Sequence, residues 1–445
     1  MKLIENNKYL LTSLGELAAQ RLKELVKKGL EPDNLQISAL SKFLEKRKYN
    51  LNAKPEKIPL INKVDFSQSD SMDCFIDLSD NKKNLIIGDY KEQFSGVIYI
   101  SGLVNNIWLD KELKKDGIAF VNRISSDYQW SRISNSVEKL DNFSKDEIFN
   151  LSIGLLNNIY ELTIPEGVTV TKPILLKIDV NTTAQFFPIL IYCHAFEQSH
   201  VKLLLDIQSK LNKDPESILS IIFIADMDSD STLDLYEIQG MDMANRYFSH
   251  ELVQVGNNAS LDRFIMDFGA KESQRIFSVD LMEKGGEAKV TGIYFPHLSQ
   301  KLGISTFQNH FADWTRSDLE FNGILDGHSN TKWDGNIYVS RETHGVDGYQ
   351  KNNNLLLSPD ARAQSIPGLE ILTDDVKCSH GVTLSHIDPN QLFYLQSRGI
   401  SRHSAEDLIK EGFLVSATSR IHAKEIENLI IRRLENYFAN NITSC

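Results

Sequence analysis

The two residues best suited to chemistry are Cys378 and His380, which stand two positions apart in a run that reads Asp-Asp-Val-Lys-Cys-Ser-His-Gly. Side chains alternate between the two faces of an extended strand, so this thiol and this imidazole point to the same side. Thiolate and imidazole are ligands for soft and borderline metals. Zinc sites and iron–sulfur clusters usually have four protein ligands, and this pair supplies two. A cluster bound here therefore needs ligands from elsewhere, for example from a second chain.

The same two residues also have a simpler interpretation. Free cysteine is often a small buried hydrophobe, and a histidine on a strand is often an ordinary surface residue. The pair alone does not separate this interpretation from a metal site.

Short sequence blocks surround the pair in a characteristic order. They read Leu-Leu-Leu-Ser, Pro-Gly-Leu-Glu-Ile, Leu-Phe-Tyr-Leu-Gln-Ser-Arg-Gly-Ile and Glu-Gly-Phe-Leu, at 355–358, 367–371, 392–400 and 411–414. In order and spacing, the blocks and the pair resemble the C-terminal signature of the SufB/SufD family of iron–sulfur cluster assembly proteins. The Cys-Ser-His-Gly version resembles the SufD type. The strong match spans about 345–415, Lys48-Tyr49-Asn50 adds a slight similarity, and Ser385 stands where the family often has glycine.

This resemblance implies a non-catalytic assembly subunit with specific partners. It implies pairing with a SufB-like β-helix chain, docking of a SufC-like ABC-type ATPase on the C-terminal helices, and a homodimer when the chain is isolated. The iron–sulfur cluster is expected to be transient and shared with the partner, and absent from the isolated chain. His380 is the expected iron ligand or proton acceptor, because neutral imidazole does both near neutral pH. Cys378 is the expected auxiliary thiol, while Asp374, Asp375 and Lys377 orient the strand or bridge the subunits.

Composition limits the class of protein. The chain has 445 residues, enough for more than one core, and its formal net charge of −12 argues against nucleic acid or anionic membrane as the main partner. The first residues lack the apolar core of a signal peptide, and no apolar run has the length of a transmembrane helix. Free thiols in a reducing compartment, the cytoplasm, are the simplest account of four scattered cysteines: Cys74, Cys193, Cys378 and Cys445.

Residues 1–157 are expected to form a mainly helical N-terminal domain. Leu14, Leu17 and Ala18 begin an apolar pattern with helical spacing, which Gly29 is expected to end. A short helix is expected near 40–44 and another over 145–156, while residues 97–100 resemble a strand.

Residues 158–386 are expected to form a mainly β core. Short apolar or alternating runs start every dozen to nineteen residues and are separated by Gly, Asn, Asp and Ser. This pattern predicts a sandwich, a barrel or a β-helix. Few tight two-residue hairpins occur, and the longer irregular loops favour a parallel β-helix. The family resemblance selects a right-handed parallel β-helix from these options.

Residues 387–445 are expected to form a C-terminal helical domain. Asp388 followed by Pro389 is a typical helix start, and Gly399 is the expected end of that helix. A second helix is predicted over 404–410 with Gly412 as its stop, and a third over 419–438. An apolar stripe on the third helix suits packing on the core or docking to a partner.

Several enzyme motifs do not occur in the sequence. It has no phosphate-binding loop, so the chain is not expected to hydrolyse nucleotide, and it has no nucleophile elbow, zinc-protease helix or dinucleotide fingerprint. Asp326, Asp334 and Asp347 leave carbohydrate cleavage open as an alternative, although turn-forming aspartates explain them as well. A purely architectural β-helix is a further alternative. Histidines are concentrated in the second half, at 297, 310, 328, 344, 380 and 386, without regular ligand spacing.

Overall fold

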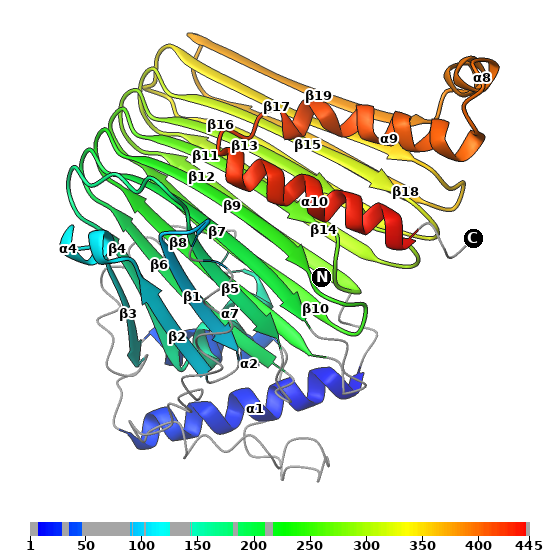
Figure 1. The fold of residues 1–445 in the computed structure, drawn as a ribbon. Coiled ribbons are helices and arrows are strands. Elements are labelled where there is room, and N and C mark those ends of the chain that lie inside the picture. The colour runs from blue at the N-terminus through cyan, green and yellow to red at the C-terminus, as the bar shows by residue number, and fades with distance from the viewer. Residues whose placement is uncertain are drawn as a thin grey trace.

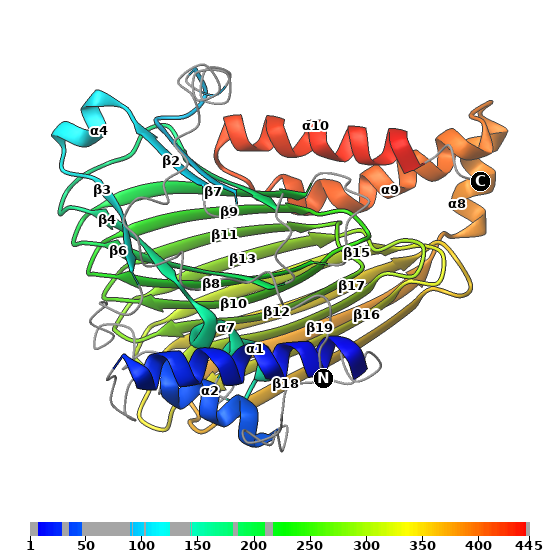
Figure 2. The same cartoon turned by 90° about the horizontal axis from the view of Figure 1, so that it is seen from below.

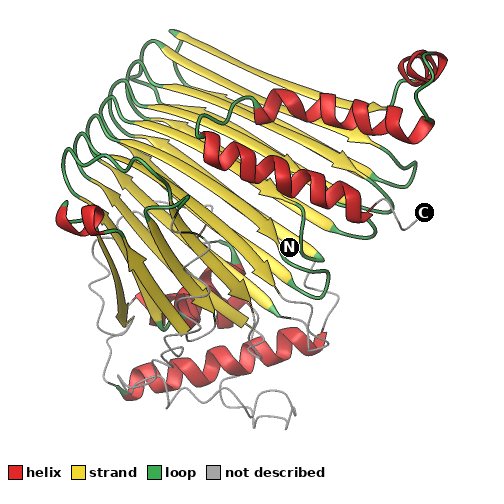
Figure 3. Ribbon diagram, in the orientation of Figure 1, coloured by secondary structure: helices red, strands yellow, loops and turns green. Residues whose placement is uncertain are grey.

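Two long sheets stacked face to face form the body of the protein (Figures 1 and 3). The computed structural model describes residues 8–28, 35–46, 90, 92–101, 104–124, 143, 145–180, 186–209 and 217–441. Sheet A has the strand order β19 (Val376–His386), β17 (Val346–Leu356), β15 (Arg316–Leu325), β13 (Glu287–Tyr294), β11 (Ser260–Asp267), β9 (Thr232–Gly240), β7 (His200–Ser209), β5 (Ile174–Val180), β1 (Gly96–Ser101) and β2 (Val104–Leu109). Sheet B has the order β18 (Arg362–Ile371), β16 (Asn330–Val339), β14 (Lys301–His310), β12 (Glu272–Leu281), β10 (Arg246–Val255), β8 (Ile218–Met227), β6 (Phe186–Ala195), β4 (Asn158–Ile164) and β3 (Ala119–Ile124).

From β4 onward the chain alternates between the sheets, so each turn of the solenoid adds one strand to each sheet. Neighbouring strands within a sheet are parallel and in register; Leu261, for example, lies opposite Leu233 on one side and Ala288 on the other. Such stacking places apolar side chains of successive turns in continuous rows between the sheets. The predicted fold class, a mainly β protein with a parallel β-helix core and flanking helices, is confirmed.

A repeated backbone conformation turns the chain at the corner that leads from sheet B to sheet A. One residue in each successive turn has a positive φ there, and its N–H donates to a carbonyl of the next turn; the Asp230 N–H, for example, donates to Asn257 O over 2.8 Å. These corner bonds explain why the sequence has longer loops instead of two-residue hairpins. The corner residues are Gly167, Gln198, Asp230, Asn258, Gly285, Trp314 and Gly345.

A charged cluster is buried between the sheets at mid-stack. Arg263 lies 2.6 Å from Glu237 and 2.7 Å from Glu251, and Arg275 also pairs with Glu237. The two arginines hold the pKa of Glu237 down, to about 2, against the effect of burial. Burial raises the pKa of nearby Asp267 to about 6. Buried charges of this kind require mutual pairing, which fixes the strands around them.

The N-terminal helices cover the outer face of sheet B, and the C-terminal helices cover the outer face of sheet A, on the opposite side of the solenoid (Figure 2). α1 (Lys8–Lys27), α2 (Leu35–Lys46) and α7 (Glu147–Leu155) pack beside β6, β8 and β10. The short α4 (Lys111–Lys115) follows β2. β1, predicted as strand-like, pairs with β5, so the first 157 residues also extend both sheets through β1, β2 and β3.

The C-terminal region contains α8 (Pro389–Ser397), α9 (Arg402–Thr418) and α10 (Lys424–Asn441). The start of α8 is as predicted, because the Asp388 carboxylate caps the helix by accepting the Asn390 N–H over 2.9 Å. The predicted stop at Gly412 is wrong, because α9 continues through it. A glycine inside a helix costs about 1 kcal/mol relative to alanine, which packing of the helix can offset. Gly29, Lys48-Tyr49-Asn50, Cys74 and Cys445 lie outside the described residues.

Candidate functional site

Cys378 and His380 lie on β19, the last strand of sheet A (Figure 1). In the parallel pairing with β17, Cys378 is opposite Gly348 and His380 is opposite Gln350. Cys378 packs with Ile337 and other interior side chains, so it faces the space between the sheets. From the two-residue alternation of a strand, we expect His380 to face the same way. Cys378 is half-buried and His380 is exposed.

We call β18 and β19 the open edge, because among the described strands each has a sheet neighbour on one side only. No residue of either strand is buried. Val382 and Leu384 on β19 are 44% and 55% exposed, and Ile366 and Leu369 on β18 are 41% and 38% exposed. An exposed strand with apolar side chains and unpaired backbone groups is a template for pairing with another chain.

Burial raises the pKa of the Cys378 thiol. The Gly348 N–H, which donates to the sulfur, acts in the opposite direction, and the charge of Asp347 adds to the rise. A thiol with a raised pKa is mostly protonated at neutral pH, so in the isolated chain Cys378 is a weak nucleophile until a metal or a positive charge arrives.

A second imidazole lies near Gly348, the residue of β17 that is opposite Cys378. His310, at the end of β14 in sheet B, is fully buried, and burial lowers its pKa to about 4, so the ring is neutral. Its Nδ1 lies 2.7 Å from Thr315 Oγ1 and its Nε2 lies 2.8 Å from Ser317 Oγ. Sequence reasoning counted His310 only as one of several scattered histidines, because nothing in the sequence links it to a cysteine on the other sheet.

The remaining histidines of the second half do not gather at Cys378. His328 lies 3.7 Å from Asp360, His344 lies 3.8 Å from Asp375, and His297 Nδ1 lies 2.9 Å from the Tyr437 hydroxyl. Within the described ranges, no group of three or more His, Cys, Asp or Glu side chains is placed to hold a metal ion.

The aspartates considered for carbohydrate cleavage have local partners. Asp326 accepts the Gly327 N–H over 2.7 Å, and Asp334 lies 3.2 Å from the ammonium of Lys332. Asp347 is exposed at the foot of β17. Asp326 thus has the turn-forming role, but that interpretation is wrong for Asp334 and Asp347, which lie within β16 and β17. No contact of these described residues favours a cleavage site.

α8 is an exposed helix beyond the end of sheet A. None of its residues is buried, and Phe393 and Tyr394 are 73% and 57% exposed. A groove of about 430 Å³ lies between α8 and α9, and nearly all of its lining is apolar. Asn390, Gln391, Tyr394, Leu395 and Ile409 line it.

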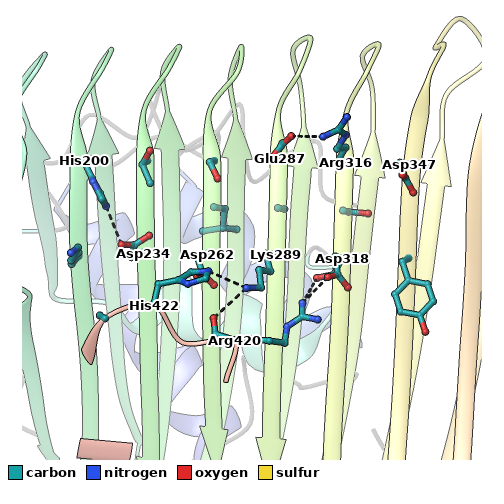
Figure 4. Close-up of a pocket in the computed structure, with 18 residues that line it drawn as sticks. His200, Asp234, Asp262, Glu287, Lys289, Arg316, Asp318, Asp347, Arg420 and His422 are labelled. Carbon is teal, nitrogen blue, oxygen red and sulfur yellow. Dashed lines mark hydrogen bonds and ion pairs between the residues drawn. The ribbon is translucent and has the colours of Figure 1, made fainter. Parts of the chain in front are cut away.

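A larger cavity, of about 850 Å³, lies on the outer face of sheet A at the turn between α9 and α10 (Figure 4). Arg420 from the turn lies 2.9 Å from Asp318 and also donates to Thr291 Oγ1 over 2.8 Å. Lys289 donates to Arg420 O over 3.2 Å, and His422 lies 3.6 Å from Asp262. The charged side chains of the cavity are thus largely paired with one another, and they fix the helical hairpin to the sheet. Sequence reasoning missed this contact, because its partners are more than a hundred residues apart.

Comparisons with known proteins identify the family of the chain. Residues 179–413, more than half of the chain, match the family described as SUF system FeS cluster assembly, SufBD core domain. An iron–sulfur cluster assembly SufBD family protein of Mycobacterium leprae is 30% identical over 203 residues, 44% of this chain and 51% of that protein. The iron–sulfur cluster assembly protein SufD of Escherichia coli is 26% identical over 190 residues, 43% of this chain and 45% of that protein.

A longer match is to the chloroplastic protein ABCI7 of Arabidopsis thaliana, which is 23% identical over 355 residues, 76% of this chain and 72% of that protein. The chain spans about half the length of the mycobacterial and Escherichia coli relatives it matches. Among the helices in the described ranges, none is both long enough and apolar enough to cross a membrane.

Proposed function

The chain belongs to the SufBD family of the SUF system for iron–sulfur cluster assembly, and from this membership we propose that it is a SufD-type scaffold subunit without catalytic activity of its own. In this proposal it works in the cytoplasm and pairs with a SufB-like solenoid chain. The cluster is cargo that is built at the junction and passed on, and it is not a resident cofactor.

The open edge supports pairing with a second solenoid. β19 has β17 on one side, and its other side is free to continue the sheet with a strand of the partner. Val382 and Leu384 would then cover apolar surface of the partner, as interior side chains do between successive turns within this chain. This observation carries the proposal, because Cys378 and His380 lie on the strand that would form the junction.

At such a junction, each side contributes part of the ligand shell. His380 is exposed on the interior-facing side of β19 and is the proposed iron ligand or proton acceptor. Cys378 is half-buried beside it and is the proposed auxiliary thiol. The described residues of this chain offer no three-donor group, so further ligands would come from the partner.

The groove between α8 and α9 supports docking of a SufC-like ATPase. An apolar groove flanked by exposed aromatic side chains fits an amphipathic helix of a partner. The ion pairs of Arg420 with Asp318 and Glu320 join the turn between α9 and α10 to β15 of sheet A. Movement of a docked ATPase would thus be passed to the sheet whose last strand, β19, forms the proposed junction.

Co-purification from the native host tests the proposal. A tagged chain is expected to bring with it both an ABC-type ATPase and a second solenoid chain. Leu384→Asp is expected to lose the solenoid chain and keep the ATPase, because the open edge and the α8–α9 groove are separate surfaces. Recovery of neither partner with the unsubstituted chain would rule the assembly role out.

A further inference from the structure

An exposed tryptophan occupies a strained position at the corner that leads from sheet B to sheet A. Trp314 has a φ of 59°, in the left-handed region, and is 56% exposed. The same position in neighbouring turns is Asn258, Gly285 or Gly345, residue types that adopt this conformation at little cost. A bulky residue with a positive φ is uncommon, and strained residues tend to cluster at functional sites. The conformation and the exposure of Trp314 together point to a use of its side chain.

Other apolar side chains are exposed on the same row of corners. Phe311 is 41% exposed and Leu372 is 43% exposed. The Phe311 ring packs against the ring of Tyr338, with their centroids 5.7 Å apart. The Trp314 ring lies against the backbone of Gly345, because a methyl group placed on this glycine would be 2.4 Å from the ring. We call the loops 311–315, 340–345 and 372–375 the corner patch.

The corner patch carries more acid than base. Its loops lie side by side, because the Trp314 N–H donates to His344 O over 2.8 Å and the Gly345 N–H donates to Asp375 O over 2.9 Å. Besides His344, the loops contain one basic residue, Arg341, and four carboxylates: Asp313, Glu342, Asp374 and Asp375. All of these carboxylates except that of Asp313 belong to exposed residues. The patch therefore combines apolar surface with a negative charge.

We propose that the corner patch binds a basic peptide segment of a partner protein, with an arginine side chain on the exposed part of the Trp314 ring. A guanidinium group stacks on aromatic rings and forms paired hydrogen bonds with carboxylates, so it fits a surface that offers both. Apolar side chains of the segment would cover Phe311 and Leu372. The charge of the patch disfavours an acidic segment.

The corner patch is formed by loops, whereas the open edge is formed by the strands β18 and β19. The two surfaces are nevertheless close in the chain, because Asp375 directly precedes β19 and Cys378 follows three positions later. A protein bound at the patch would thus be held beside the proposed junction. This consequence rests on the proposed function, whereas the peptide site does not.

Selection from a library of random twelve-residue peptides displayed on phage tests the inference. The library is first cleared on the Trp314→Asn chain and is then selected on the unsubstituted full-length chain. Asparagine adopts the left-handed conformation readily, as Asn258 does at the same position of another turn, so this variant removes the ring without strain. The selected peptides are expected to be basic and to contain arginine together with leucine, isoleucine or phenylalanine.

Fluorescence anisotropy with a labelled selected peptide measures each contribution. Trp314→Asn is expected to lower the affinity at least tenfold. Asp374→Asn combined with Asp375→Asn is expected to lower it at least threefold, and less at high salt. Phe196→Ala is the matched control and should bind normally: Phe196 is 37% exposed and, like Phe311, directly follows a strand of sheet B, but in a distant turn.

Circular dichroism verifies that each variant is folded. A selection that yields no peptide, or yields acidic ones, would overturn the peptide site, and so would an unchanged affinity in Trp314→Asn. Leu384→Asp at the open edge is expected to bind the peptide normally, so failure of the corner patch and failure of the proposed junction are distinguishable.

Discussion

Arg420 on the turn between α9 and α10 lies 2.9 Å from the carboxylate of Asp318 on β15 and 3.3 Å from that of Glu320. Its side chain is only 16% exposed. Hydrogen bonds to charged groups contribute about 1.5–3 kcal/mol, and the partners left behind are partly desolvated. Arg420→Ala is therefore expected to release the hairpin from sheet A, which hydrogen exchange in α9 and α10 would detect as faster exchange in these helices than elsewhere.

The matched control for that variant is Arg316→Ala. Arg316 pairs with Glu287 over 3.3 Å on the same face, but both side chains are exposed, 69% and 51%. Exposed pairs contribute little, so exchange in α9 and α10 should not change. Equal effects of the two substitutions would contradict the role given to Arg420.

The buried carboxyl of Asp267 predicts a specific pH dependence of stability. Its pKa in the folded chain is about 6, above the 3.8 of an unperturbed aspartate, so folding favours the neutral form. This contribution is complete below about pH 4 and is lost as the pH rises through 6. Asp267→Asn stays neutral and should gain stability relative to the unsubstituted chain between pH 4 and 7, by roughly 2–3 kcal/mol. Urea unfolding at several pH values measures the difference, and a difference that is the same at every pH would contradict the prediction.

Leu384 on the open edge provides a test of the solenoid junction. Leu384→Asp puts a charge where an apolar contact with the partner is proposed, so the affinity of the pair should fall at least tenfold. The stability of the isolated chain should change by less than about 0.5 kcal/mol, because the side chain is 55% exposed. Leu298→Asp is the control: that leucine is 57% exposed but lies in a corner loop away from β19. If both variants pair normally when mixed with the second solenoid chain in analytical ultracentrifugation, the open edge is not the junction.

Phe393 on α8 tests the docking of the ATPase. Exposed aromatic side chains at a helix groove often dominate binding energy, and truncation of such a residue commonly costs 2 kcal/mol or more. Phe393→Ala should weaken ATPase binding by at least about tenfold in a calorimetric titration. Val26→Ala on α1, where the valine is 57% exposed, should bind as the unsubstituted chain does. Equal affinities for both variants would place the ATPase elsewhere.

Local sequence signals predicted much of the fold. The apolar runs predicted the strands, because a strand that is covered on both faces has few polar positions. In β8, Ile218–Met227, all but one residue is buried. Asp388 and Pro389 marked the start of α8 because a cap is set by adjacent residues. The helix end predicted at Gly412 was wrong, because the packing of α9 against sheet A outweighs the low helix propensity of one glycine.

Only the part of the candidate site that lies on one strand could be predicted from local sequence. Cys378 and His380 lie on one strand, so their common direction follows from strand geometry alone. His310 comes from the other sheet and lies near Gly348, the residue opposite Cys378, which depends on the register of strands in both sheets. Arg420 likewise meets Asp318 through tertiary packing. Contacts of this range are set by how the turns stack, which no local pattern encodes.

Cluster formation by the reconstituted complex is the sharpest test of the role given to His380. His380→Ala is compared with the unsubstituted chain and with His328→Ala, an exposed histidine that is not a proposed ligand. His380→Ala is expected to form the same complex but to yield at least tenfold less cluster, measured by visible absorption and by iron and sulfide content, while His328→Ala is expected to be normal. If His380→Ala yields as much cluster as the unsubstituted chain, and a chain with both Cys378 and His380 replaced does so too, the protein is architectural and neither residue takes part in cluster assembly.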